Sequence, residues 1–319
     1  MNGHILVIKT GALGDIVIAR PAIEAIRDHH PGAAITVLTT PAYAALVALI
    51  PEIRVTAFHR KGWIHACRLR RWLRASRFDV AYDLQGSRHA RRAADWSGAP
   101  VLHRLPPERP AEHACARLGR LLRDAGLTPP AVPPRWPAPA EARSRMADWM
   151  AAQGFDPQRL VLVHAGTSRR WPTKRWPPAH FAALARRLAG DGMQIAWIGG
   201  PDDAALNRRL VKAAGTGTVA TLDIPCLLAL AERACLGIGN DSGPMHLMAA
   251  AGLPVYGLFG PTDWRRSHAV GQRDRALHID VDCGPCHRRR CPRRHRHRCM
   301  TDLDVETVWR AINEQTRDG

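Results

Sequence analysis

Hydrophobic and polar residues follow two alternating periods along residues 1–125. Short β-branched runs, such as Ile5-Leu6-Val7-Ile8, are separated by longer segments with apolar residues at helical spacing. This alternation is typical of βαβ units, which form a parallel sheet. The predicted strands are Ile5–Lys9, Ile35–Thr39, Arg54–Phe58, Asp79–Leu84 and Pro100–His103, and the predicted helices are Ile16–His29, Ile64–Ser76 and Glu112–Ala125.

The pattern then stops and restarts. Residues 128–139 contain six prolines, which exclude regular structure and indicate a linker or the approach to one. A helix is predicted after these prolines, over Ala140–Gln153. The second series then begins at Leu160 and predicts strands Leu160–His164, Gln194–Ile198, Leu236–Gly239 and Val255–Phe259, and helices Ala179–Ala189, Ala204–Ala214, Cys226–Ala234, Met245–Ala251 and Val305–Gln315. We therefore predict two Rossmann-like α/β domains, residues 1–155 and 156–319, with the Pro-rich segment near the end of the first.

Composition narrows the class of protein. The 319 residues are 46% hydrophobic and 23% charged, which excludes a disordered chain and a small disulfide-stabilised domain. No apolar stretch approaches the roughly 20 residues of a membrane-spanning helix. The N-terminus has no basic, apolar and cleavage regions in the order of a signal peptide. We expect a cytoplasmic protein.

The charge is strongly positive. Lys and Arg number 46 against 28 Asp and Glu, a net charge of +18, and only four of the cations are lysines. Such a charge attracts nucleic acid, anionic lipid or phosphorylated small molecules. It is equally consistent with the base composition of a GC-rich genome. Four of the eight cysteines, Cys67, Cys115, Cys226 and Cys235, are scattered and are interpreted as small core residues.

A glycine-containing turn follows the first predicted strand. It reads Lys9-Thr10-Gly11-Ala12-Leu13-Gly14-Asp15 and matches neither the dinucleotide fingerprint nor the triphosphate-binding loop. Asp15 is open to two interpretations. It is either an N-cap of the helix or an ionised carboxylate at the sheet edge where open α/β sheets bind ligands.

Two further strand ends carry polar residues. His164-Ala165-Gly166-Thr167-Ser168 leads into a basic segment with Lys174, which is either a phosphate-binding loop or a solvated loop with tryptophans filling the core. Residues 240–246 read Asn-Asp-Ser-Gly-Pro-Met-His, where a strand ends and a helix begins at proline. Backbone N–H groups there form either a plain turn or a diphosphate socket that works without a metal.

Together these residues resemble a known family. Asp241-Ser242-Gly243-Pro244-Met245-His246, followed by Gly257-Leu258-Phe259-Gly260-Pro261-Thr262, is similar to the donor-site signature of the lipopolysaccharide heptosyltransferases, glycosyltransferase family 9. Segments 11–15, 83–86 and 174–177 and the Cys-rich tail follow in that family's order, so the resemblance extends over most of the chain.

The resemblance implies a GT-B fold, in which two Rossmann-like parallel-sheet domains face a central cleft. It implies an acceptor on the N-terminal domain, an ADP-sugar on the C-terminal domain, and inverting transfer of heptose from ADP-heptose to the inner core of lipopolysaccharide. Asp15 matches the catalytic base. The positions that match donor contacts are Thr167, Lys174, Asp241, Ser242, Gly243 and His246, and the candidate acceptor contacts are Gly11, Gln85 and Arg88.

The chemistry of these residues agrees with that implication. Inverting transfer needs one base for the acceptor hydroxyl. The departing diphosphate needs positive charge, which a helix N-terminus and Lys174 can supply if the loop after Thr167 folds back. We therefore expect no metal or other cofactor in catalysis.

The C-terminal tail is rich in cysteine and arginine. Cys283, Cys286, Cys291 and Cys299 have C-x2-C-x4-C-x7-C spacing among seven arginines and three histidines. They form a structural zinc site, reduced or partly disulfide-linked thiols, or an iron–sulfur site; zinc is not the favoured interpretation, since the spacing is not that of a zinc ribbon. We expect the arginines to contact an anionic lipid-linked acceptor, with the protein peripheral on the cytoplasmic face of the inner membrane.

Two alternative functions stay open. One is a GT-B transferase with a different nucleotide sugar or acceptor. The other is a basic nucleic-acid-binding protein, which explains the charge but not Asp15 and the Asp241 segment on separate domains. The leading interpretation needs ADP-heptose and an anionic acceptor as partners, and no nucleic acid.

Overall fold

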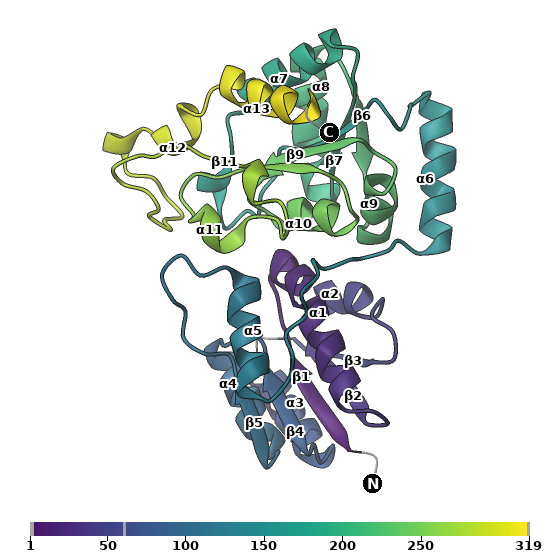
Figure 1. Cartoon of the computed structure of the whole chain (residues 1–319), viewed down its shortest axis with the longest axis vertical. Coiled ribbons are helices and arrows are strands. Elements are labelled where there is room, and N and C mark those ends of the chain that lie inside the picture. Colours follow the sequence, from purple (N-terminus) through teal and green to yellow (C-terminus); the bar gives the residue numbers. More distant parts are fainter. Residues whose placement is uncertain (1–2, 60–61, 318–319) are drawn as a thin grey trace. The chain divides into compact units, whose positions relative to one another are not determined.

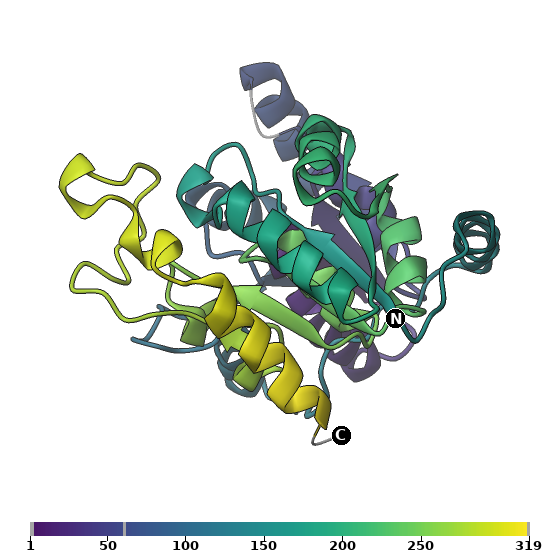
Figure 2. The ribbon, with the colours of Figure 1, turned by 90° about the horizontal axis from the view of Figure 1, so that it is seen from above.

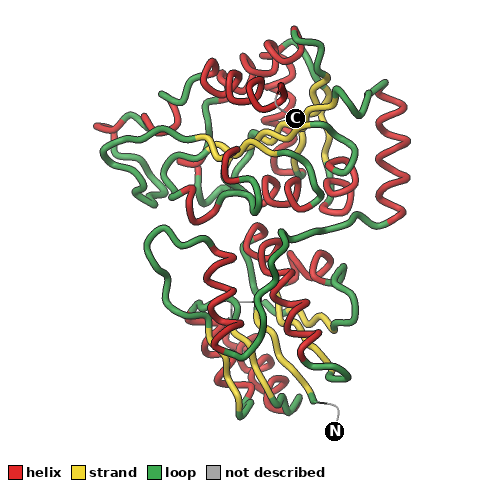
Figure 3. The backbone as a smooth tube through the Cα atoms, in the orientation of Figure 1, coloured by secondary structure: helices red, strands yellow, loops and turns green. Residues whose placement is uncertain are grey.

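The computed structural model describes residues 3–59 and 62–317. Its contacts divide the chain into two units, residues 1–134 and 135–319. Each unit is a parallel β-sheet flanked by helices (Figures 1 and 3). No helix in the described part of the chain is both long enough and apolar enough to cross a bilayer.

The first unit contains a five-stranded sheet in the order β3-β2-β1-β4-β5, with every neighbouring pair parallel. Its strands are His4–Ile8 (β1), Ala34–Thr39 (β2), Arg54–Ala57 (β3), Val80–Asp83 (β4) and Val101–Arg104 (β5). Its helices are Leu13–His29 (α1), Pro41–Val47 (α2), Trp63–Ala75 (α3), Arg88–Ser97 (α4) and Ala114–Asp124 (α5).

Alternation along the central strand distributes its side chains to the two faces of this sheet. Leu6 and Ile8 of β1 belong to the buried cluster that includes Leu69 and Leu73 of α3 and the alanines of α4. Ile5 and Val7, also buried, point to the opposite face. Burial on both faces is why β1 reads as a continuous apolar run.

The second unit contains a six-stranded parallel sheet in the order β11-β10-β9-β6-β7-β8. Its strands are Leu160–His164 (β6), Gln194–Gly199 (β7), Thr218–Thr221 (β8), Leu236–Asn240 (β9), Val255–Leu258 (β10) and Ala276–Leu277 (β11). Its helices are Ala140–Gln153 (α6), Pro178–Gly190 (α7), Ala204–Ala214 (α8), Ile224–Ala231 (α9), Gly243–Ala250 (α10), Trp264–Ser267 (α11), Arg298–Thr301 (α12) and Val305–Arg317 (α13). Short 3-10 helices span Pro172–Lys174, Pro201–Asp203, Arg273–Arg275 and Arg293–His295.

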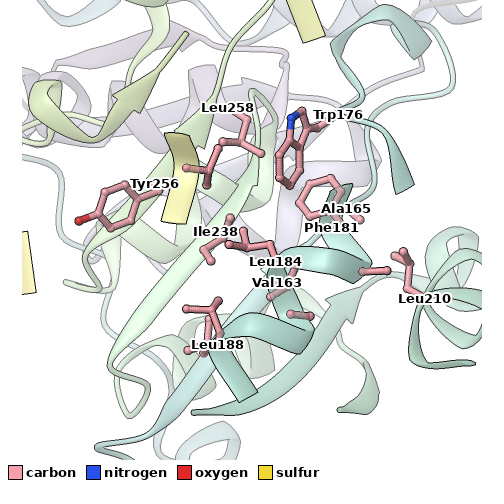
Figure 4. Packing of buried hydrophobic residues seen from close by; sticks show 14 of the residues in the cluster. Val163, Ala165, Trp176, Phe181, Leu184, Leu188, Leu210, Ile238, Tyr256 and Leu258 are labelled. Carbon is pink, nitrogen blue, oxygen red and sulfur yellow. The ribbon is translucent and has the colours of Figure 1, made fainter. Parts of the chain in front are cut away.

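The core of the second unit lies between its sheet and a helical layer. Phe181, Leu184 and Leu188, one face of α7, pack on Val163 and Ile238 of the central strands (Figure 4). The C-terminal helix α13 lies beside α7 (Figure 2) and adds Val308 and Ile312 to the same cluster. The i, i+3, i+7 spacing of the α7 residues is the sequence feature that predicted this buried stripe.

The alternating pattern predicted the main strands and helices with bounds shifted by a few residues at most. It did not predict α2, α4, β8, β11 or the short helices α11 and α12. The contacts also place a division at residue 134 rather than 155, because α6 packs on α9. Trp136 is fully buried and its N–H donates to Ala250 O at 2.9 Å, so the end of the Pro-rich segment belongs to the second unit.

Candidate functional site

Asp15 lies in the first turn of α1, just after β1 in the first unit. The helix begins at Leu13 with Ala12 as its N-cap, so Asp15 is the third helical residue and not the N-cap of one interpretation. Its Oδ2 accepts the N–H of Ala12 at 3.0 Å, and the residue is half-buried. The carboxylate thus supports the helix start while staying partly accessible at the strand-end edge of the sheet.

Two buried ionisable side chains lie at strand ends of this sheet, and the sequence did not predict a role in the site for either one. The Lys9 ammonium donates to Leu84 O at 3.0 Å; burial lowers its pKa, while Asp15 and Asp83 oppose that shift. Asp83 Oδ1 accepts the N–H groups of Gln85 and Gly86 at 2.9 and 2.8 Å, and its buried Oδ2 has no partner in the described structure. Burial raises the pKa of Asp83 despite these bonds. The feature of the sequence that could have indicated Lys9 is its position, a lysine at the end of an apolar strand.

The candidate acceptor residues are only partly brought together. Gln85 Oε1 accepts the N–H of Thr10 at 3.0 Å, so Gln85 lies beside the turn that contains Gly11. Gly11 has a φ of 128°, and a Cβ at this position would stand 2.7 Å from the Tyr43 ring. Arg88 is exposed at the first residue of α4. The backbone conformation and the nearby Tyr43 ring therefore require glycine at position 11, independently of any contact with an acceptor.

In the second unit, two side chains meet on one carboxylate oxygen. Lys174 Nζ lies 2.7 Å from Asp241 Oδ2, and the Thr262 hydroxyl donates to the same oxygen at 2.6 Å. Asp241 follows β9 and is 5% exposed. The loop after Thr167 therefore does fold back, as the position of Lys174 required. Thr262 ends the segment Gly257–Thr262 that carries the family resemblance, but the sequence did not predict its contact with Asp241.

Neighbouring polar residues fix this strand end. Asn240 is buried; its side chain accepts the N–H of Trp176 at 2.9 Å and donates to Ala165 O at 2.9 Å. The Thr167 hydroxyl accepts from Arg175 Nε at 3.0 Å and donates to Trp171 O at 3.2 Å. In this structure Thr167 organises the loop. The buried Trp176 also bears out one part of the solvated-loop interpretation, that a tryptophan there fills the core.

Helix α10 begins directly after Asp241. Ser242 is its N-cap residue, and in the described structure its side chain makes no capping hydrogen bond to the first turn. Gly243 and Pro244 open the helix, and His246 is buried within it. The first-turn N–H groups and the helix dipole therefore face the strand-end edge, where an anion would be stabilised.

His164, at the end of β6, connects two polar groups of this edge. Its Nδ1 lies 3.3 Å from the Ser242 hydroxyl, and its Nε2 lies 3.6 Å from Asp203 Oδ2. Burial acts to raise the pKa of Asp203, but His164, the Gly200 N–H and Arg175 together lower it. A Cβ on Gly199 would stand 2.6 Å from the Asp203 Cβ, so the glycine makes room for this approach.

The four C-terminal cysteines line one cavity of about 270 Å³ together with Thr173, Pro261 and histidines 295 and 297. All four are free thiols, and Cys299 has its pKa raised to about 12, chiefly by burial. No three Cys, His, Asp or Glu side chains are arranged to hold a metal ion in residues 3–59 and 62–317. The set Cys283, Cys286, Cys291 and Cys299 stays a prediction as a metal site.

Comparison with known proteins identifies the family. Residues 66–297, more than half of the chain, match Glycosyltransferase family 9 (heptosyltransferase). The chain is 26% identical to Lipopolysaccharide heptosyltransferase 1 of Pseudomonas aeruginosa, covering 90% of this chain and 87% of that protein.

Solved structures are similar over most of the chain. The glycosyl transferase family 9 protein of Veillonella parvula superposes with a TM-score of 0.83 at 21% identity, covering 99% of this chain and 98% of that one. E. coli heptosyltransferase WaaC with ADP-2-deoxy-2-fluoro heptose superposes with a TM-score of 0.62 at 21% identity, covering 82% and 90%. These similarities confirm the predicted GT-B fold class, and the chain belongs to glycosyltransferase family 9, the heptosyltransferases.

Proposed function

We propose that this protein is an inverting glycosyltransferase that moves heptose from ADP-heptose to the inner core of lipopolysaccharide. The observation that carries the proposal is the meeting of Lys174 and Thr262 on Asp241 beside the N-terminus of α10, in a chain of this family. A cation beside uncapped helix N–H groups is the arrangement that a sugar diphosphate needs.

The donor site acts on the leaving group. The Lys174 ammonium has three N–H donors, so it can hold Asp241 and donate to a phosphate oxygen at the same time. As the sugar–oxygen bond breaks, negative charge grows on the diphosphate, and Lys174 and the α10 N–H groups stabilise it. We propose that Thr167, Ser242, Gly243 and His246 complete this site and that no divalent metal takes part.

Asp15 acts on the acceptor in this mechanism. It takes the proton of the attacking hydroxyl while the new bond forms at the anomeric carbon on the face opposite the diphosphate, which inverts the configuration. The partial accessibility of Asp15 supports the assignment. Gly11, Gln85 and Arg88 are proposed to contact the acceptor, and the arginines of the tail to face its anionic groups at the inner membrane surface.

The donor is tested by thermal shift with ADP, UDP, GDP and RNA. We expect stabilisation by ADP alone; stabilisation by another nucleotide favours a different nucleotide sugar, and stabilisation by RNA alone overturns the proposal. The product is then tested by mass spectrometry after incubation with ADP-heptose and defined core acceptors. No heptose transfer to any of them would contradict the acceptor.

Metal independence is tested by calorimetric ADP titration with EDTA present. We expect wild-type binding to persist, because backbone N–H groups and Lys174 supply the positive charge. Gly243→Val adds a side chain where the diphosphate approaches the backbone, and we expect ADP binding to be lost in a folded protein. Gly190→Val, at the exposed end of α7 with open space around it, is the matched control. Wild-type binding that vanishes with EDTA refutes the proposal.

A further inference from the structure

The Cys-rich loop, residues 283–299, contacts the segment that carries Lys174. The Thr173 hydroxyl donates to Arg288 O at 2.7 Å, and His297 Nε2 donates to Thr173 O at 2.5 Å. Thr173 is 7% exposed, so its own hydroxyl and carbonyl lie in a largely buried position. The 3-10 helix Pro172–Lys174 is thus tied to the loop on the residue next to Lys174.

A third contact runs through Trp171. The Arg289 guanidinium from the Cys-rich loop lies 5.4 Å from the centroid of its ring, and Lys174 Nζ lies 5.3 Å from the same centroid. Cations at this distance are attracted to the face of an indole. The loop and the donor-site lysine therefore share one aromatic contact.

The same loop also contacts the segment that carries Thr262. The His287 N–H donates to Pro261 O at 2.8 Å. A Cβ on Gly260 would stand 3.2 Å from Cys299 Sγ and would collide with Met300, so this segment lies directly against the end of the loop. The cysteine-lined cavity is bounded by Thr173 on one segment and Pro261 on the other.

The two segments that the loop contacts carry side chains that bind the same oxygen atom. Lys174 and Thr262, which follow the two segments held by the loop, both bind Oδ2 of Asp241. We propose that the Cys-rich loop is the positioning element of the donor site, with Thr173 and His297 as positioning residues that set the Lys174 ammonium over Asp241. This inference rests on the proposed ADP-sugar donor.

The test is ADP titration of the full chain by calorimetry. Thr173→Val keeps the shape but removes the bond to Arg288, and we expect ADP affinity to fall about three- to ten-fold, the effect of one hydrogen bond. Thr173→Ser restores the hydroxyl and should bind ADP like wild type. Thr221→Val, at an exposed threonine at the end of β8, is the matched control and should leave affinity unchanged.

A double-mutant cycle separates positioning from general destabilisation. If Thr173 acts through Lys174, Thr173→Val should add no further loss of affinity in a Lys174→Ala background. If Thr173→Val unfolds, His297→Asn replaces it: His297 has a φ of 59°, a conformation that asparagine tolerates, and the shorter side chain cannot reach Thr173 O.

The outcomes distinguish the two proposals. Wild-type protein that binds no ADP overturns the proposed donor and this inference with it. Wild-type protein that binds ADP, with Thr173→Val and His297→Asn binding equally well, overturns the positioning role alone. An equal loss in the presence and absence of Lys174 also overturns it, because the loop would then act by another route.

Discussion

Asp15 and Asp241 both lie between a strand and a helix, each in its own unit, but they have different surroundings. Each follows a strand of a parallel sheet and lies at the start of a helix. Asp241 is buried and shares one oxygen with an ammonium and a hydroxyl. Asp15 is half-buried and accepts one backbone N–H. The Asp241 carboxylate therefore holds a cation in place for an anionic ligand, whereas the Asp15 carboxylate is accessible to an acceptor hydroxyl.

The largest expected effect tests the Asp15 half of this comparison. Asp15→Asn keeps the oxygen that accepts the Ala12 N–H but removes the negative charge, so kcat should fall by roughly 10²–10⁴-fold, the usual effect of losing a general base. ADP affinity should barely change, because Asp15 belongs to the other unit. The measurements are kcat at saturating ADP-heptose and ADP calorimetry.

Asp28→Asn is the matched control, an exposed aspartate on the same helix that pairs with Arg27. It should leave kcat unchanged. Near-normal turnover in Asp15→Asn would show that Asp15 only supports the start of α1 through its bond to the Ala12 N–H, and it would remove the contrast between the two carboxylates.

The next effect tests the Asp241 half. Lys174→Ala removes the cation beside the leaving diphosphate, so kcat/KM for the donor should fall by roughly 10- to 100-fold, the range of a charge-assisted hydrogen bond. Both the donor KM and kcat should change, since charge on the diphosphate grows during the reaction. Steady-state kinetics with varied ADP-heptose measure this, and Lys212→Ala, an exposed lysine on α8, is the control. Unchanged donor kinetics would remove Lys174 from the site.

Sequence reasoning predicted the fold well where apolar residues are large. The continuous apolar runs of β1 and β6 predict buried strands, and the apolar residues of α7 recur at helical spacing. In each case the period of the large apolar residues matches one type of secondary structure. Helix α4 shows the limit. Its buried face consists of Ala90, Ala93, Ala94 and Ser97, small residues among arginines, so the face that it buries has no large apolar side chain, although the helix is amphipathic and Ser87 caps it. Likewise, β11 has two residues and gains its structure only by pairing with β10.

The sequence predicted which residues belong to the candidate site, but it did not predict which of them contact one another. The motif identified Asp241 and Lys174, 67 positions apart, yet their ion pair depends on a loop whose path is set by Asn240 and the Cys-rich loop. Lys9 and Asp83 were not assigned because the sequence does not state how far each is buried, and their importance arises from burial.

A smaller expected effect concerns how the stability of each unit depends on pH. The pKa of Asp83 in the first unit is raised, so its contribution to folding is present below its ordinary value of 3.8 and lost as the pH rises through the raised value. The pKa of Asp203 in the second unit is lowered, so its contribution is present above 3.8 and lost as the pH falls through the lowered value. Acidification should therefore weaken the second unit relative to the first.

Thermal unfolding of Asp203→Asn and Asp83→Asn at pH 6 and pH 3 measures this difference. Asp203→Asn should lower the Tm more at pH 6 than at pH 3, because only the ionised carboxylate interacts with His164 and Arg175. Asp83→Asn should show the reverse dependence, costing less at pH 6. The same sign for both variants would contradict the opposite shifts.

The smallest expected effect is a change in Tm that tests where the boundary between the units lies. Glu232 on the C-terminal end of α9 accepts from Arg143 Nε of α6 at 2.7 Å and from the Ala138 N–H at 2.8 Å, which ties α6 and the end of the Pro-rich segment to the second unit. Arg143 is largely exposed, so Arg143→Ala should lower the Tm by only about 1–3 °C, and less in high salt. Glu232→Ala should lower it more, since the Ala138 N–H then also loses its partner. Hydrogen exchange should quicken in α6 and α9 in both variants and stay unchanged in residues 3–59 and 62–127. Faster exchange in the first unit instead would show that α6 belongs with it and that the boundary lies near residue 155, as the sequence alone predicted.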